Sequence, residues 1–183
     1  MPPKMIPAGY MARFVSKKPD WLRADAVEDI YSVTCTGEDF ADYIQYWKHN
    51  GFWLFDSPQL IRSIAQEHSI SLEKAHLFYY ESYEFEFDED NWQIFMLDPT
   101  ISTKVILPSD KHLEGFDIVA FSNGTVPEHS PLSCNSMAEE VATNSHCLFS
   151  SFEEAQFNLE NGSFKDCEPG PYRIFSVNSV SWT

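Results

Sequence analysis

Residues 83–92 alternate aromatic and acidic side chains and then pass through a polar turn. Tyr83, Phe85 and Phe87 are each followed by a residue that carries a carboxylate. Because successive side chains of a β-strand point to opposite faces, this pattern predicts a strand with one aromatic and one acidic face. Residues 88–91 predict a turn, and residues 92–97 predict the returning strand of an antiparallel hairpin. The chain is therefore expected to contain an antiparallel sheet.

Two stretches before the hairpin have the spacing of amphipathic helices. Residues 38–49 carry apolar side chains at helical intervals and are followed by Gly51, where a helix commonly ends. Residues 58–68 also place their apolar side chains on one face. Ser57 precedes them as an N-cap candidate, and Pro58 occupies the first helical position, where proline is favoured. Both stretches are predicted to be short helices.

Serine and glutamate residues three positions apart predict two more helices after the hairpin. Ser136 with Glu139 predicts a helix near residues 137–142, and Ser151 with Glu154 predicts one over residues 152–160. Further strands are predicted where β-branched and aromatic residues gather between turn residues. These strands cover residues 29–35, 52–55, 103–107, 116–121 and 172–182, with a turn at Asn123-Gly124.

Helices and strands do not alternate in this order, which favours an α+β fold over a doubly wound parallel sheet. We expect a mixed, mainly antiparallel sheet of about six to eight strands, with three or four short helices packed on it. No internal repeat is apparent in the sequence. Four prolines among residues 1–24 predict an irregular basic arm there. Residues 25–183 then form a single α+β domain, since typical domains contain about 100–200 residues.

The charge of the chain is strongly negative and unevenly distributed. The sequence has 12 Lys and Arg residues against 28 Asp and Glu, a net charge of −16. Residues 1–24 are an exception, because Asp20 is their only acidic side chain. A body this acidic repels nucleic-acid backbones and anionic lipids, so we expect no direct nucleic-acid binding and no membrane binding. A basic protein partner would be attracted, although acidity also serves solubility alone.

The first functional hypothesis is an acidic interaction protein of the inhibitor type, which binds a basic macromolecule rather than acting as an enzyme. Carboxylates on the predicted strand and tyrosines on the predicted helix at 38–49 form the candidate binding surface, since exposed aromatic residues are frequent in binding hot spots. The alternative is a solvated acidic face with no partner. The candidate residues are Glu81, Glu84, Glu86, Asp88, Tyr43 and Tyr46.

The second hypothesis is a small cysteine-dependent hydrolase or transferase. Cys134 is the candidate nucleophile, His129 or His146 the base, and Asn135 an orienting amide, because cysteine catalysis requires a nearby base. A helix that begins near Ser133 would place Cys134 in its first turn, where the helix dipole favours a thiolate. A buried, inert thiol is the competing interpretation.

No metal and no cofactor are expected. Cys134, His146, Cys147 and Cys167 are zinc-type ligands, but they lack the paired spacing of zinc sites. Glycine-rich phosphate-binding loops and the G-x-S-x-G and H-E-x-x-H motifs are absent, which argues against common nucleotide-dependent enzymes, α/β-hydrolases and metalloproteases. No apolar run reaches the roughly 18 residues of a membrane helix. We therefore expect a cytoplasmic protein whose four cysteines are reduced.

Overall fold

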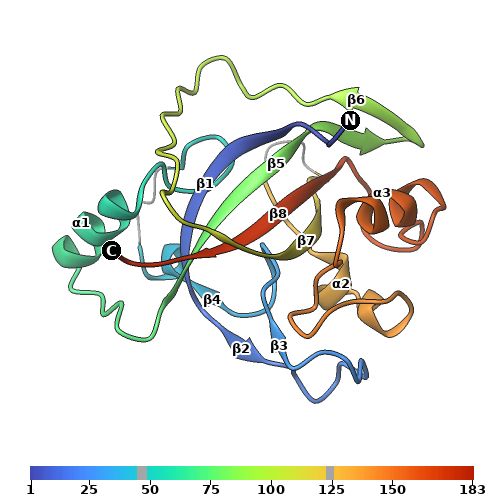
Figure 1. The fold of residues 1–183 in the computed structure, drawn as a ribbon, viewed down its shortest axis with the longest axis horizontal. Coiled ribbons are helices and arrows are strands. Elements are labelled where there is room, and N and C mark those ends of the chain that lie inside the picture. Colours follow the sequence, from blue (N-terminus) through green and yellow to red (C-terminus); the bar gives the residue numbers. More distant parts are fainter. Residues whose placement is uncertain (45–48, 123–125) are drawn as a thin grey trace.

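A curled antiparallel sheet forms the centre of the molecule in the computed structural model, which describes residues 1–44, 49–122 and 126–183 (Figure 1). Its strands follow the order β4-β1-β5-β8-β7, and β6 is a further strand that pairs with β5 outside this order. β2 and β3 form a separate two-stranded ribbon. The strands are β1 (Met5–Phe14), β2 (Ser16–Lys17), β3 (Asp29–Ile30), β4 (Glu38–Asp39), β5 (His76–Asp88), β6 (Asn91–Ile94), β7 (His112–Ala120) and β8 (Tyr172–Val180).

In the described part of the chain, three short α-helices and two 3₁₀ helices lie around the sheet. They are η1 (Phe40–Tyr43), α1 (Pro58–Glu67), α2 (Pro131–Cys134), η2 (Met137–Glu139) and α3 (Phe152–Glu160). The predicted α+β class and the mainly antiparallel sheet are confirmed. Within the described residues the main sheet has six strands.

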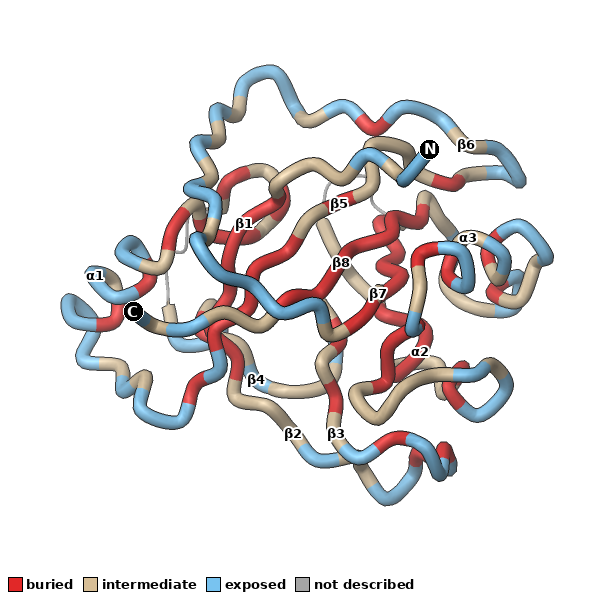
Figure 2. Tube along the Cα trace, in the orientation of Figure 1, coloured by how far each residue is buried: buried red, intermediate tan, exposed pale blue. Residues whose placement is uncertain are grey.

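The middle strands are buried on both faces. Tyr79 and Tyr80 are neighbours in β5 that point to opposite faces, yet both are fully buried. Seven consecutive residues of β8 are buried as well. Figure 2 shows this buried path along β1, β5, β8 and β7, with exposed residues mainly in the surrounding loops and helices. Aromatic side chains therefore fill cores on both sides of the sheet, which explains their abundance.

The predicted irregular arm is wrong for residues 5–14, because they form β1 and pair with β5 along most of its length. The strand buries Ala8, Tyr10, Met11 and Ala12 in the core. Pro7 does not prevent this, since it lies at a shift in the pairing register between Pro7 and Gly9. Proline is tolerated at such bulges because no ladder hydrogen bond from its nitrogen is needed there.

Several other predicted elements are shorter than expected. The helix over 38–49 is replaced by β4 and η1, where Asp39 caps the 3₁₀ turn, and residues 45–48 lie outside the described residues. The strand over 29–35 shrinks to β3, residues 52–55 contribute only an isolated bridge between Tyr10 and Phe55, and residues 103–107 form no strand. The turn predicted at Asn123-Gly124 lies outside the described residues.

The two halves of the described chain share one architecture, which the sequence alone did not reveal. In the first half, β1 leads through a bridging loop to α1 and β5. In the second, β7 leads through a bridging loop to α3 and β8. β5 and β8 are neighbours in the sheet, with β1 and β7 outside them. In Figure 1, α1 and α3 accordingly lie at opposite sides of the sheet.

The strand register supports a local two-fold relation between the halves. Gly9 of β1 pairs with Tyr80, and Gly115 of β7 pairs with Val177. Tyr80 and Val177 also pair with each other across β5 and β8. Equivalent residues that pair with one another place the two-fold axis between them, so the expectation of no internal repeat is wrong for the structure.

The bridging loops carry the clearest sequence trace of this repeat, Asn-x-x-x-Leu-Phe-x-Ser at residues 50–57 and 144–151. In each loop the asparagine side-chain oxygen accepts hydrogen bonds from the backbone N–H groups two and four residues later. Its amide nitrogen donates to the carbonyl of Ala8 in the first half and of Glu114 in the second. The final serine of each motif caps α1 or α3.

A glycine faces each bridging loop. Gly9 has φ +135° and Gly115 has φ +152°. A Cβ atom at Gly9 would lie 2.7 Å from the carbonyl oxygen of Phe55, and one at Gly115 would lie 2.7 Å from that of Phe149. Both the backbone angle and the close approach require glycine. Because each glycine has no side chain, the bridging loop can come close enough to pair with the next residue of the strand, Tyr10 in β1 or Phe116 in β7.

Candidate functional site

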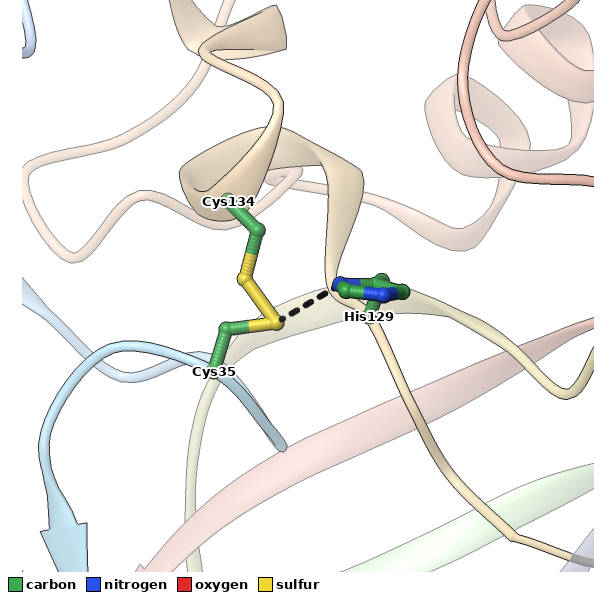
Figure 3. Close-up of side chains that lie close together, drawn as sticks. All are labelled: Cys35, His129 and Cys134. Atoms are coloured by element: carbon green, nitrogen blue, oxygen red, sulfur yellow. Dashed lines mark hydrogen bonds between the residues drawn. A yellow bond between two sulfur atoms is a disulfide. The ribbon is translucent and has the colours of Figure 1, made fainter.

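Cys35 and Cys134 form a disulfide between two segments that are 99 residues apart in the sequence, with a Cα–Cα distance of 6.0 Å. Cys35 lies in the loop after β3, and Cys134 is the last residue of α2 (Figure 3). Cys35 is exposed and Cys134 is half-buried. The expectation of four reduced cysteines is therefore wrong for this pair. Sequence reasoning singled out Cys134 but not Cys35, because no local motif marks the partner.

A buried carboxylate holds the two segments together below the sulfur atoms. Asp117 of β7 is fully buried, and its Oδ2 accepts hydrogen bonds from the backbone N–H of Val33 and from the hydroxyl of Ser130, each at 2.7 Å. A hydrogen bond of 2.7 Å between the hydroxyls of Ser32 and Ser133 also joins the same two segments. These bonds lie next to Cys35 and Cys134, so they position both cysteines.

Arg13 fixes the Cys35 loop from the other side. This β1 residue is buried, and its guanidinium donates to the carbonyl oxygens of Val33 at 2.7 Å and Thr36 at 3.1 Å. Two backbone carbonyls that flank Cys35 are thereby tied to the central sheet. The exposed sulfur is presented by a loop that is anchored from both sides.

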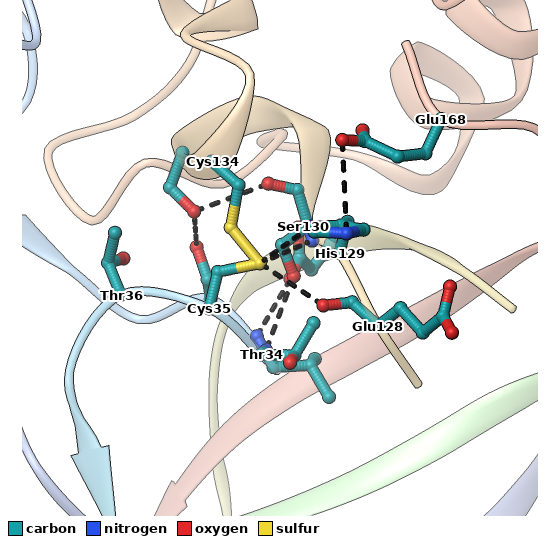
Figure 4. Close-up of a disulfide and its surroundings, with 12 residues drawn as sticks. Thr34, Cys35, Thr36, Glu128, His129, Ser130, Cys134 and Glu168 are labelled. Carbon is teal, nitrogen blue, oxygen red and sulfur yellow. Dashed lines mark hydrogen bonds and ion pairs between the residues drawn. A yellow bond between two sulfur atoms is a disulfide. The ribbon is translucent and has the colours of Figure 1, made fainter. Parts of the chain in front are cut away.

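His129 lies against the exposed sulfur. Its Nδ1 is 3.6 Å from Cys35 Sγ, and its Nε2 is 3.8 Å from a carboxylate oxygen of Glu168 (Figure 4). The backbone N–H of Ser130 donates to the same sulfur at 3.3 Å. A neighbouring imidazole and a backbone donor both favour negative charge on sulfur. Once the disulfide is reduced, the group thus has a nucleophilic sulfur, a base beside it and a carboxylate that orients the base.

The other two cysteines are poor nucleophiles. Cys147 and Cys167 are free thiols. Burial raises the pKa of Cys147 to about 12. Burial and the carboxylates of Glu168, Asp166 and Glu140 raise the pKa of Cys167 to about 11. Both thiols stay protonated near neutral pH, so the reactive sulfur chemistry of the chain is confined to Cys35 and Cys134.

The predicted environment of Cys134 needs correction. α2 begins at Pro131 and ends at Cys134, so the cysteine lies at the C-terminal end of this short helix and not in its first turn. Ser136 has left-handed backbone angles, and its side chain makes no capping hydrogen bond. The backbone N–H of Asn135 donates to Pro131, and no contact among the described residues joins its side chain to the sulfur pair. Asn135 is therefore not placed as an orienting amide.

His146 belongs to a different cluster. Its Nδ1 lies 2.6 Å from a carboxylate oxygen of Asp29, its Nε2 lies 3.6 Å from Glu114, and its ring stacks on Tyr31 at 4.0 Å. These contacts tie β3 and β7 to the second bridging loop. Of the two predicted bases, only His129 is brought to the cysteines.

The predicted acidic surface is largely neutralised by contacts within the chain. Glu81 pairs with Lys111 at 2.8 Å, and Glu84 pairs with Lys4 at 3.2 Å. Glu86 is mostly buried and binds Arg173. Asp88 lies at the end of β5, Tyr43 is exposed with its hydroxyl donating to Glu38, and Tyr46 lies outside the described residues. These pairings reduce the number of carboxylates that β5 offers to a partner.

Only one cluster of metal-type ligands is found in the described part of the chain. It consists of Cys35, His129 and Cys134, whose ligand atoms lie within 4.8 Å of one another. The set predicted as a zinc alternative is therefore not assembled. Three donors fall short of the four that structural zinc requires, and both sulfurs would first have to be reduced. None of the described helices has the length and apolar character needed to cross a membrane.

The buried carboxyl of Asp117 makes stability depend on pH. Burial raises its pKa from 3.8 to about 6, although hydrogen bonds from Ser130, Val33 and Ile118 oppose this rise. The folded state holds the proton of Asp117 more tightly than the unfolded state does. The stability that this proton contributes is therefore fully present below pH 3.8 and is lost as the pH rises through 6. Between pH 5 and pH 7 the free energy of unfolding of the wild type should therefore fall by about 1 kcal/mol more than that of Asp117→Asn.

Urea unfolding of both proteins at several pH values measures this difference. The other carboxylates titrate in both proteins, so their contribution cancels in the comparison. Parallel pH profiles for the two proteins would show that Asp117 is already ionised throughout this range.

Comparisons with protein-family models, curated proteins and solved structures find no match to this chain.

Proposed function

We propose that Cys35 and Cys134 form a thiol–disulfide exchange site, in which His129 assists the exposed sulfur. The observation that carries this proposal is the 3.6 Å contact between His129 Nδ1 and the Sγ of Cys35 in an exposed disulfide. This proposal retains Cys134 and His129 from the predicted cysteine-dependent enzyme and adds the Sγ of Cys35 as the reacting atom. In a reducing compartment such as the predicted cytoplasm, disulfides are usually transient and catalytic.

The proposed reaction transfers two electrons from a substrate dithiol to the protein disulfide. A substrate thiolate attacks Cys35 Sγ, the exposed sulfur, and forms a mixed disulfide while Cys134 leaves as a thiolate. The second thiolate of the substrate then attacks the substrate sulfur of the mixed disulfide. This forms the substrate disulfide and releases Cys35 as a thiolate. His129 and the Ser130 N–H stabilise that thiolate. The products are the substrate disulfide and two protein thiols, and the reverse sequence reduces a substrate disulfide.

Alkylation of the native protein tests this site. After reduction, Cys35 and Cys134 should react with N-ethylmaleimide, Cys35 first, while Cys147 and Cys167 stay unmodified. His129→Asn should slow the reaction of Cys35 at pH 7 by roughly tenfold, the effect expected from losing a neighbouring imidazole that favours the thiolate. His68→Asn, at the exposed end of α1, is the matched control and should leave the rate unchanged.

The exchange itself is measured with a reduced peptide that contains two cysteines. The oxidised protein should convert it to the disulfide in a one-to-one reaction, and Cys35→Ser should abolish the conversion. If four free thiols are found in denatured protein that was oxidised beforehand, the pair does not form and the proposal fails.

A basic protein partner for the acidic body, bound in an inhibitor-type interaction, stays a prediction. It rests on the net charge of −16, and attraction of this kind weakens as salt rises.

A further inference from the structure

We infer that the cavity in front of Arg173 binds a small apolar carboxylate. The cavity has a volume of about 450 Å³, within the range of small-molecule sites. Its lining includes Trp53, Phe95, Leu97, Ile101 and the guanidinium-bearing residue Arg173. One cation beside aromatic and aliphatic side chains, as in the described lining, is the combination that orients an amphiphilic ligand. This site is separate from the cysteine pair.

Arg173 is held rigidly at this cavity. Its side chain is 4% exposed, and its guanidinium carbon lies 3.5 Å from the ring centre of Phe95 and 4.0 Å from that of Phe121. Its Nε donates to Glu86 at 3.0 Å. The aromatic rings and the carboxylate therefore fix the plane of the guanidinium before any ligand arrives.

The Nη groups of the guanidinium are the donors that can serve a ligand. Among residues 1–44, 49–122 and 126–183, Glu86 is the one residue to which Arg173 donates a hydrogen bond, and it does so through Nε. Guanidinium has five N–H donors, so the Nη groups still have donors to offer. Burial lowers the pKa of Arg173 to about 10, which leaves the side chain charged at neutral pH. A planar pair of donors matches a carboxylate in two parallel hydrogen bonds.

The neighbouring charges favour a monoanion. Burial lowers the pKa of His49, and its Nδ1 accepts a hydrogen bond from the Gly51 N–H, so its ring is neutral at neutral pH. Asp98 is exposed, and its carboxylate accepts hydrogen bonds from Thr100. Arg173 is the one cation in the described part of the lining, and because it is already paired with Glu86 it cannot balance a dianion beside Asp98. A phosphate monoester is therefore disfavoured.

The cavity wall selects an apolar body for this ligand. His49 and Trp53 stack on each other at 3.7 Å, and both line the cavity. Leu97 and Ile101 line the same cavity with aliphatic carbon. These side chains add affinity through buried apolar area for the part of a ligand that lies against them. A ring or short chain that ends in a carboxylate fits both features.

A pair of isosteric probes tests the charge requirement without altering the protein. Calorimetric titration of the intact chain should show that 4-phenylbutyrate binds at least about tenfold more tightly than 4-phenylbutyramide, since a charge-assisted pair of hydrogen bonds is lost in the amide. Equal affinity for the two probes, or no binding of the acid up to about 10 mM, overturns the inference.

Variants then locate the binding. Arg173→Met combined with Glu86→Gln removes both buried charges together, so no ion is left unpaired. This double variant should bind the acid no more tightly than the amide. Arg62→Met is the control, because Arg62 stacks on Trp182 away from the cavity lining, and it should keep the preference for the acid. A preference retained in the folded double variant assigns the carboxylate to another site.

Discussion

Gly115→Ala is expected to lower the free energy of unfolding by about 2–6 kcal/mol. About 1–3 kcal/mol comes from forcing a side chain onto a backbone with φ +152°, and a similar amount from overpacking against the Phe149 carbonyl. The bridging loop cannot move away easily, because Phe116 and Phe149 exchange two backbone hydrogen bonds. Urea unfolding measures the loss, and Gly9→Ala should behave in the same way.

Gly162 provides the matched control for this prediction. It also has a positive φ, +78°, but nothing lies within 4 Å of a Cβ atom built there. Gly162→Ala should therefore show only the cost of the backbone angle, about 1 kcal/mol. If Gly115→Ala costs no more than this control, the close approach of the bridging loop does not constrain the fold.

Arg173→Met alone is expected to cost about 3–5 kcal/mol, because it leaves the mostly buried carboxylate of Glu86 without its partner. The double variant with Glu86→Gln should recover much of that stability, since no buried charge remains. Stability measurements on the two single variants and the double variant give the coupling energy of the pair.

The exposed pair of Lys4 and Glu84 is the comparison for this cycle. The Lys4 side chain is 73% exposed, so Lys4→Met should cost less than about 1 kcal/mol. A similarly small cost for Arg173→Met would mean that Glu86 is neutralised or solvated by other means. That result would also weaken the case for a preorganised cation at the cavity.

Elements with local signals were predictable from the sequence. The hairpin of β5 and β6 follows from alternation and a polar turn, and the structure pairs Phe87 with Trp92 as expected. The helices α1 and α3 begin where their serine caps predict, with Ser57 accepting from the Leu60 N–H and Ser151 from the Glu154 N–H. In each case the decisive hydrogen bonds join residues a few positions apart.

The parts that failed depend on contacts between distant segments. β1 was predicted to be irregular because prolines dominate its local pattern, whereas its strand structure comes from pairing with β5 about 70 residues later. The candidate site has the same character: Cys35 meets Cys134 only because Asp117, Ser130 and Arg13 fix the two segments. The residue types alone predicted His129 and Cys134 as site residues, but no sequence spacing connects them with Cys35 or Glu168.

The two-fold relation between the halves separates what the scaffold demands from what it merely tolerates. Asp117 of β7 occupies the position that Met11 holds in β1, and Arg173 of β8 occupies the position of His76 in β5. The same backbone is thus built once with an apolar residue and once with a buried acid. The architecture requires neither the buried acid at Asp117 nor the buried cation at Arg173, since the equivalent residues are the apolar Met11 and the exposed His76. Such departures from internal equivalence are where specialisation of an otherwise duplicated frame is to be sought.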